Sequence, residues 1–179
     1  MLPPLPHDYL ARMPRHVEAA DLLSVGLDAS GRDALLARSA AGAWIAMKET
    51  AASAGINLLL VSAFRSMAAQ RAILESKLAS GDSWTEILAG CAYPGFSEHH
   101  TGRAVDVGAA GALQLDEQFE NTAEFRWLSS NAGRFGFSLS YPRGNGYGII
   151  YEPWHWCFRP MAQPGACGSR VEQDRLDEV

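Results

Sequence analysis

The sequence has little cysteine, no excess of basic residues and no long hydrophobic run. Its three cysteines, Cys91, Cys157 and Cys167, are an odd number without a CxxC pair, so they predict no disulfide framework and leave the redox compartment open. Cys157 and Cys167 could close a short loop, but free thiols packed as small hydrophobes are favoured. Fifteen Lys and Arg against twenty Asp and Glu give a formal net charge of -5, which argues against a nucleic-acid partner.

Neither a membrane span nor a secretory leader is visible. The longest obvious apolar run, residues 58–61, suits a buried strand and falls well short of the ~18 residues that a span needs. The N-terminus, MLPPLPHD, has no basic segment followed by an apolar stretch, so it is not a secretory signal as written. Either the protein stays inside the cell or the chain starts after a removed signal.

What is present is an ordinary globular composition. With 179 residues, 47% of them hydrophobic and 20% charged, the chain is long enough for one domain with a core. No internal repeat appears. We expect an irregular N-terminal arm over 1–32 with one short helix, a folded domain over 33–160, and a loose polar C-terminal tail over 161–179.

The hydrophobic pattern predicts a mixed set of elements. Apolar residues recur at three- and four-residue steps over 33–54, which predicts a helix ended by Gly55, and Ser66 can cap a second helix over 67–79. Further helices are expected over 84–89 and from about 122 to 135. Strands are expected over 57–62, 103–107 and 137–141, with a last hairpin or bent strand over 149–152 and 154–158, and a loop over 91–102. These elements predict an α+β domain in which a small, mostly antiparallel sheet packs against helices.

Chemistry-bearing residues gather in two segments of unusual composition, SEHHTGRAVD over 97–106 and YEPWHW over 151–156. A strand entered at Gly102 would carry Asp106 on one side, and His99 lies on the loop just before it, so the two side chains could converge. Pro153 forbids a helix interior in the second segment, and a tight turn there would bring Glu152 beside His155. His7 and His16 have no such companions and are expected at the surface.

Two imidazoles and one carboxylate suit a divalent cation. Such a set leaves the fourth position of a tetrahedral zinc open for water, whose pKa falls to about 7. Glu152 could then take the proton of that water. Nitrogen and oxygen ligands also suit other metals, although zinc is the default for hydrolysis. Each short pattern alone is better explained by ordinary structure, a capped turn and a core histidine, than by a metal site.

The longer string, SxHxxGxAxD followed some fifty residues later by EPWH, resembles the VanY-type zinc D-alanyl-D-alanine carboxypeptidases and dipeptidases of peptidase family M15. The resemblance covers roughly residues 33–160, and its matching stretches are 62–66 with Gln70, 94–106, 119–142 and 152–156. It implies the fold of the hedgehog and D-Ala-D-Ala peptidases. It also implies cleavage of the C-terminal D-amino acid from peptidoglycan stem peptides.

The resemblance also implies a role for individual residues. It implies zinc ligands at His99, Asp106 and His155, a catalytic base at Glu152, and an arginine, Arg65, that holds the substrate near the metal. Further candidates for substrate contact are Ser97, Gln70 and Trp154, the last with a packing role as well. Two positions depart from the pattern: position 100 is often Gln and is His100 here, and Phe64 stands where Tyr is common. His100 is expected to point away from the metal, in a supporting or surface position.

The role of Arg65 also has a physical basis, because a carboxypeptidase must recognise a free carboxylate and a guanidinium does so with two hydrogen bonds. Several alternatives stay open: an L,D-carboxypeptidase or a peptidoglycan endopeptidase with the same zinc site, a non-catalytic zinc-stabilised binding module, and a metal-free protein. The substrate favours the periplasm or cell envelope, while the missing signal leaves a cytoplasmic location open.

Overall fold

The computed structural model describes residues 2–160. Along these residues the helices and strands follow in the order α1 (Tyr9–Arg12), β1 (Leu22–Leu27), β2 (Asp33–Ala37), α2 (Arg38–Ser53), β3 (Leu59–Ser62), α3 (Met67–Ala79), α4 (Trp84–Gly90), η1 (Glu98–Thr101), β4 (Ala104–Gly108), η2 (Glu117–Asn121), α5 (Ala123–Asn131), η3 (Ala132–Phe135), β5 (Phe137–Leu139) and β6 (His155–Phe158). The η elements are short 3₁₀ helices.

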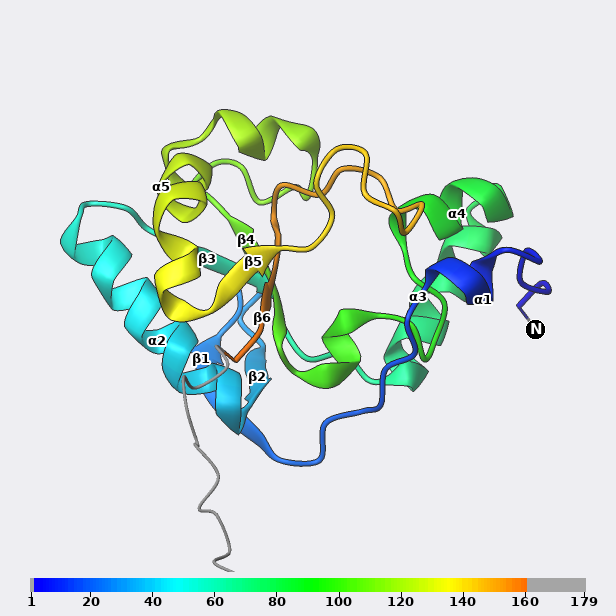
Figure 1. Cartoon of the computed structure of the whole chain (residues 1–179), viewed down its shortest axis with the longest axis horizontal. Helices are drawn as coiled ribbons and strands as arrows, with labels where there is room; N and C mark the ends of the chain where they lie inside the picture. Colours follow the sequence, from blue (N-terminus) through cyan, green and yellow to red (C-terminus); the bar gives the residue numbers. More distant parts are fainter. Residues whose placement is uncertain (1, 161–179) are drawn as a thin grey trace, which may run out of the picture.

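A four-stranded antiparallel sheet with the order β3-β4-β6-β5 forms the centre of the molecule, and β1 pairs with β2 in a separate two-stranded sheet. In Figure 1, α2 and α5 lie to the left of the four-stranded sheet, while α1, α3 and α4 gather on the right. The predicted α+β domain is therefore confirmed. Because β4 and β6 are neighbours, Asp106 pairs directly with His155.

The main core lies between the four-stranded sheet and the helices α2 and α5. Trp44 of α2, Val105 of β4 and Leu128 of α5 are fully buried in it. All five residues of β4 are buried, as expected for a central strand covered on both faces. A smaller cluster joins Tyr9 and Met13 of the N-terminal segment to residues beside the site.

The N-terminal region is more ordered than the sequence predicts. Residues 1–32 were expected to form an irregular arm, and the predicted short helix is α1, but β1 also lies there and pairs with β2. The predicted helix start at residue 33 is wrong, because 33–37 form β2 and α2 begins at Arg38. A short apolar run suits a strand as well as a helix, and only pairing with β1 decides between them.

Other boundaries differ less. The helix α3 spans 67–79 as predicted, and the Ser66 side chain accepts a hydrogen bond from the Ala69 N–H at 3.0 Å. The helix expected over 122–135 is divided into α5 and η3, and the expected loop over 91–102 contains η1. Residues 149–152 form no strand, so the last hairpin is wrong: β6 pairs with β4 and β5 instead.

Within residues 2–160, no helix combines the length and the apolar character needed to cross a membrane. The predicted tail over 161–179 and the question of a Cys157–Cys167 pair lie outside the described residues. Cys91 and Cys157 are both buried, as expected for cysteines that pack as small hydrophobes.

Candidate active site

The three predicted metal ligands lie together in the structure. His99 comes from η1, Asp106 from β4 and His155 from β6, and each side chain is buried. One candidate ligand atom from each lies within 4.8 Å of the others. The His99 Nδ1–H donates to the Ala63 carbonyl at 2.6 Å, which leaves His99 Nε2 facing Asp106 Oδ2 at 3.1 Å. His155 Nδ1 lies 3.0 Å from Asp106 Oδ1.

The charges of these groups fit a cation site. Burial alone would raise the pKa of Asp106, but its contacts with the two imidazole rings lower it, so the carboxylate is ionised. Burial lowers the pKa of His99, so its Nε2 has a free lone pair. Burial opposes charge on His155, yet hydrogen bonds to Asp106 and Glu98 raise its pKa to about 10. A metal at this site would therefore displace a proton from His155.

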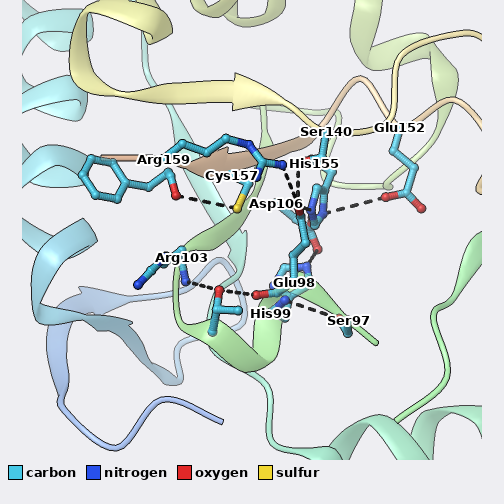
Figure 2. Close-up of polar contacts among 12 residues, drawn as sticks. Ser97, Glu98, His99, Arg103, Asp106, Ser140, Glu152, His155, Cys157 and Arg159 are labelled. Carbon is cyan, nitrogen blue, oxygen red and sulfur yellow. Dashed lines mark hydrogen bonds and ion pairs between the residues drawn. The ribbon is translucent and has the colours of Figure 1, made fainter. Parts of the chain in front are cut away.

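Glu152 lies on the turn that leads into β6. Its backbone N–H donates to the Tyr141 carbonyl at 3.1 Å, and its own carbonyl accepts from the His155 N–H at 3.1 Å. This turn aims the carboxylate at His155, with Glu152 Oε2 3.8 Å from His155 Nδ1 (Figure 2). Burial raises the pKa of Glu152 to about 7. A carboxyl group with such a pKa can both accept and release a proton near neutral pH.

This raised pKa predicts a stability effect in metal-free protein. A carboxyl whose folded pKa lies above its ordinary value of 4.5 stabilises the fold below pH 4.5, and that stabilisation is lost as the pH rises through 7. Metal-free Glu152→Gln is therefore expected to be more stable than the metal-free parent at pH 8, by on the order of 3 kcal/mol, with the difference shrinking toward pH 4.5. Urea unfolding with a chelator present measures it. Equal unfolding free energies at pH 8 would show that burial of Glu152 carries no such cost.

Arg65 directs its guanidinium into the same site. It follows β3, and its side chain is 20% exposed. Nη1 donates to Gln70 Oε1 at 2.9 Å and Nη2 donates to Ser62 Oγ at 2.9 Å, while Nη2 lies 3.7 Å from Asp106 Oδ2. Each Nη has a second N–H, so the guanidinium can still receive a carboxylate.

Both ends of the Gln70 amide are hydrogen-bonded within the protein. Oε1 accepts from Arg65, and Nε2 donates to the Ala92 carbonyl at 2.6 Å. Gln70 is buried, although it lines the cleft described below. These bonds hold Arg65 in place, and the direct contact of Gln70 with substrate stays a prediction.

Ser97 and Trp154 both line the cleft and both have structural roles. The Ser97 side chain caps η1 by accepting from the His99 N–H at 3.3 Å. Trp154 is buried and belongs to the main core. Packing and substrate contact are compatible for both residues.

His100 points away from the metal site, as expected, but it is not at the surface. It is completely buried; its Nδ1–H donates to the Arg65 carbonyl at 2.6 Å, and its Nε2 accepts from the Gly95 N–H at 3.1 Å. His100 thus connects the loop before η1 to the backbone of Arg65. His7 is exposed as predicted, whereas His16 is only partly exposed and its Nε2 is buried.

A cleft of about 660 Å³ opens onto these side chains. Its lining includes Arg65 and the buried residues Ser97, His99, Asp106, Glu152 and His155. It continues over α3 and α4, where Ile73, Ile87 and Ile150 line it beside Lys77, Asp82 and Glu86. The site therefore has room for a peptide chain that extends away from the cation site.

Sequence reasoning assigned no role to Glu98, which is buried beside the predicted ligands. Its carboxylate contacts His155, Ser140 and Arg159, as Figure 2 shows. Its position next to His99 in the motif is visible in the sequence. Its contacts are not, because the partners lie 42 to 61 residues further along the chain.

Comparison with known proteins places the chain in a family. The VanY family model, described as D-alanyl-D-alanine carboxypeptidase, matches residues 33–161. The chain belongs to this family. A curated relative, the putative carboxypeptidase YodJ of Bacillus subtilis (strain 168), is 32% identical over 170 residues, which cover 90% of this chain and 60% of the relative. The chain thus spans less than two thirds of that relative's length.

Two solved structures are similar to this chain in fold and sequence. The LdcB LD-carboxypeptidase is 31% identical with a TM-score of 0.70, over 81% of this chain and 71% of that one. The vancomycin resistance D,D-pentapeptidase VanY from a VanB-type cassette, solved in complex with Zn(II), is 26% identical with a TM-score of 0.60, over 87% of this chain and 82% of that one.

Proposed function

We propose that this chain is a zinc-dependent carboxypeptidase that removes the C-terminal D-alanine from peptidoglycan stem peptides ending in D-Ala-D-Ala. The observation that carries the proposal is the convergence of His99, Asp106 and His155 with Glu152 and Arg65 in one cleft. Membership of the VanY family and the zinc complex of a similar D,D-pentapeptidase support it. Because peptidoglycan lies in the cell envelope, we expect the protein to act there.

The donor set suits zinc. His99 would offer Nε2, His155 Nδ1 and Asp106 one carboxylate oxygen, and three protein ligands leave a position open, as in catalytic zinc sites. Bound zinc supplies Lewis-acid chemistry, which polarises a carbonyl group and acidifies water. A site with a purely structural metal normally has four protein ligands and needs no base.

Arg65 binds the terminal carboxylate of the peptide in this proposal. Its guanidinium is held by Gln70 and Ser62 and lies 3.7 Å from Asp106, so a carboxylate bound to it would place the last peptide bond beside the three ligands. Positioning of this kind contributes to the rate because it removes the entropic cost of aligning the reacting groups.

Glu152 is the general base of the proposed reaction. Its carboxylate takes a proton from the attacking water and delivers it to the nitrogen of the departing D-alanine. The pKa of about 7 produced by burial suits both steps, since the group is neither permanently charged nor permanently neutral near pH 7.

The test is product analysis on purified stem peptides. We expect the protein to convert a pentapeptide ending in D-Ala-D-Ala to the tetrapeptide plus D-alanine, to lose this activity with a chelator, and to recover it with added zinc. Release of free D-alanine, followed by mass spectrometry of the shortened peptide, is the measurement. Intact pentapeptide with zinc-loaded protein would contradict the proposal.

A second candidate function is L,D-carboxypeptidase activity, which removes D-alanine from the tetrapeptide. The similarity in fold and sequence to the LdcB LD-carboxypeptidase supports it. The same assay distinguishes the two, because tetrapeptide would be shortened and pentapeptide left intact. Cleavage of cross-linked muropeptides would instead indicate an endopeptidase.

A further inference from the structure

We propose that Glu98 is a positioning residue for His155: its carboxylate accepts the Nε2–H of the ring and so presents Nδ1 to the metal. The inference rests on the proposed zinc site, and it assigns a function to a buried acid that is neither a ligand nor the base.

The contact is direct. Glu98 Oε2 lies 3.0 Å from His155 Nε2, while His155 Nδ1 on the opposite side of the ring faces Asp106 at 3.0 Å. Both side chains are buried, with 8% of the Glu98 side chain and 4% of the His155 side chain exposed. The ring therefore lies between two carboxylates that reach it from different elements, and only Nδ1 faces the cluster of proposed ligands.

Glu98 is itself held at both oxygens. Ser140 Oγ donates to Oε2 at 2.5 Å, and Arg159 Nη2 donates to Oε1 at 3.0 Å. Ser140 follows β5 and Arg159 follows β6, so this carboxylate joins η1 to the ends of two strands (Figure 2). The buried bond from Ser140 holds Oε2, the oxygen that contacts His155, so this carboxylate can fix the orientation of the ring even without Arg159.

The two proposed histidine ligands are oriented by different partners. His99 donates from Nδ1 to the Ala63 carbonyl, which is neutral, whereas His155 donates to the charged Glu98. Hydrogen bonding to a carboxylate fixes the ring tautomer, strengthens the ligand as a donor, and is typically worth 10–100-fold in metal affinity or activity.

The alternative is that Glu98 acts only as an ion-pair partner of Arg159. The Arg159 side chain is 58% exposed, so this pair is solvent-screened and contributes little. Arg159→Ala removes the pair and leaves the contact with His155, which makes it the matched control.

The experiment measures zinc affinity by competition with a chromophoric chelator. Glu98→Ala is expected to bind zinc 10–100-fold more weakly than the parent, and Arg159→Ala within threefold of it. The visible absorption of cobalt-substituted protein is expected to change for Glu98→Ala and to stay unchanged for Arg159→Ala. Parent-like affinity of Glu98→Ala, or an equal loss in both variants, would overturn the assignment.

Glu98→Gln covers the case in which the alanine variant does not fold. Its amide oxygen still accepts from Nε2 but has no charge, so we expect zinc affinity at least threefold below the parent, and parent-like affinity would count against the proposal. Zinc binding is measured without peptide. If the parent binds zinc but cleaves no stem peptide, the proposed function is wrong. A loss of zinc affinity in the Glu98 variants would then still support the positioning role of Glu98.

Discussion

Glu152→Gln is expected to lower kcat for the pentapeptide by roughly 10²–10⁴-fold while zinc stays bound, the range typical for loss of a general base. The substitution keeps the shape of the side chain and removes its ability to accept a proton. Zinc content should be unchanged, because the three proposed ligands come from His99, Asp106 and His155. Steady-state release of D-alanine, together with the metal content of the same preparation, gives the measurement.

A matched control is available for this prediction. Glu75→Gln makes the same chemical change on the exposed face of α3, outside the cleft, and is expected to turn over like the parent. If Glu152→Gln retains parental kcat with zinc bound, the assignment of the base is wrong, and another group must move the proton.

Arg65→Ala is expected to lower kcat/KM for peptides with a free C-terminus by roughly 10²–10³-fold, because a charge pair in the cleft is lost. Arg65→Lys should recover only part of this, since an ammonium group lacks the planar pair of donors. Rates for free-acid and C-terminally amidated versions of one peptide provide the measurement.

The parent enzyme should strongly prefer the free acid, and Arg65→Ala should lose most of that preference. Arg71→Ala, on the exposed side of α3, is the matched control and should keep it. Equal cleavage of amidated and free peptides by the parent would argue against carboxypeptidase activity and for an endopeptidase.

Much of the site could be predicted because its parts are local. The period of two along a strand puts Asp106 on a defined side of β4, and Pro153 excludes a helix interior where the turn brings Glu152 beside His155. The cap at Ser66 predicted the start of α3 for the same reason, since a cap and its partner lie three residues apart.

Errors arose where distant segments decide the structure. Residues 33–37 have an apolar pattern that suits either a helix or a strand, and their pairing with β1 selects the strand. The sequence around His100 left a supporting and a surface position both open. The residue is buried because its ring is hydrogen-bonded to the backbone of Arg65 and of Gly95. The bond from the Gln70 amide to the Ala92 carbonyl also joins separate segments, while the contact of Gln70 with substrate stays a prediction.

The sequence by itself determined the chemical types at the site and the local turns that present them, because spacing over a few residues controls both. Only the tertiary structure decided that β4 and β6 are neighbours with Asp106 opposite His155, and that Glu98 reaches the far side of the same ring. Such contacts join segments about fifty residues apart. They depend on how the sheet and helices pack, which no short stretch of sequence specifies.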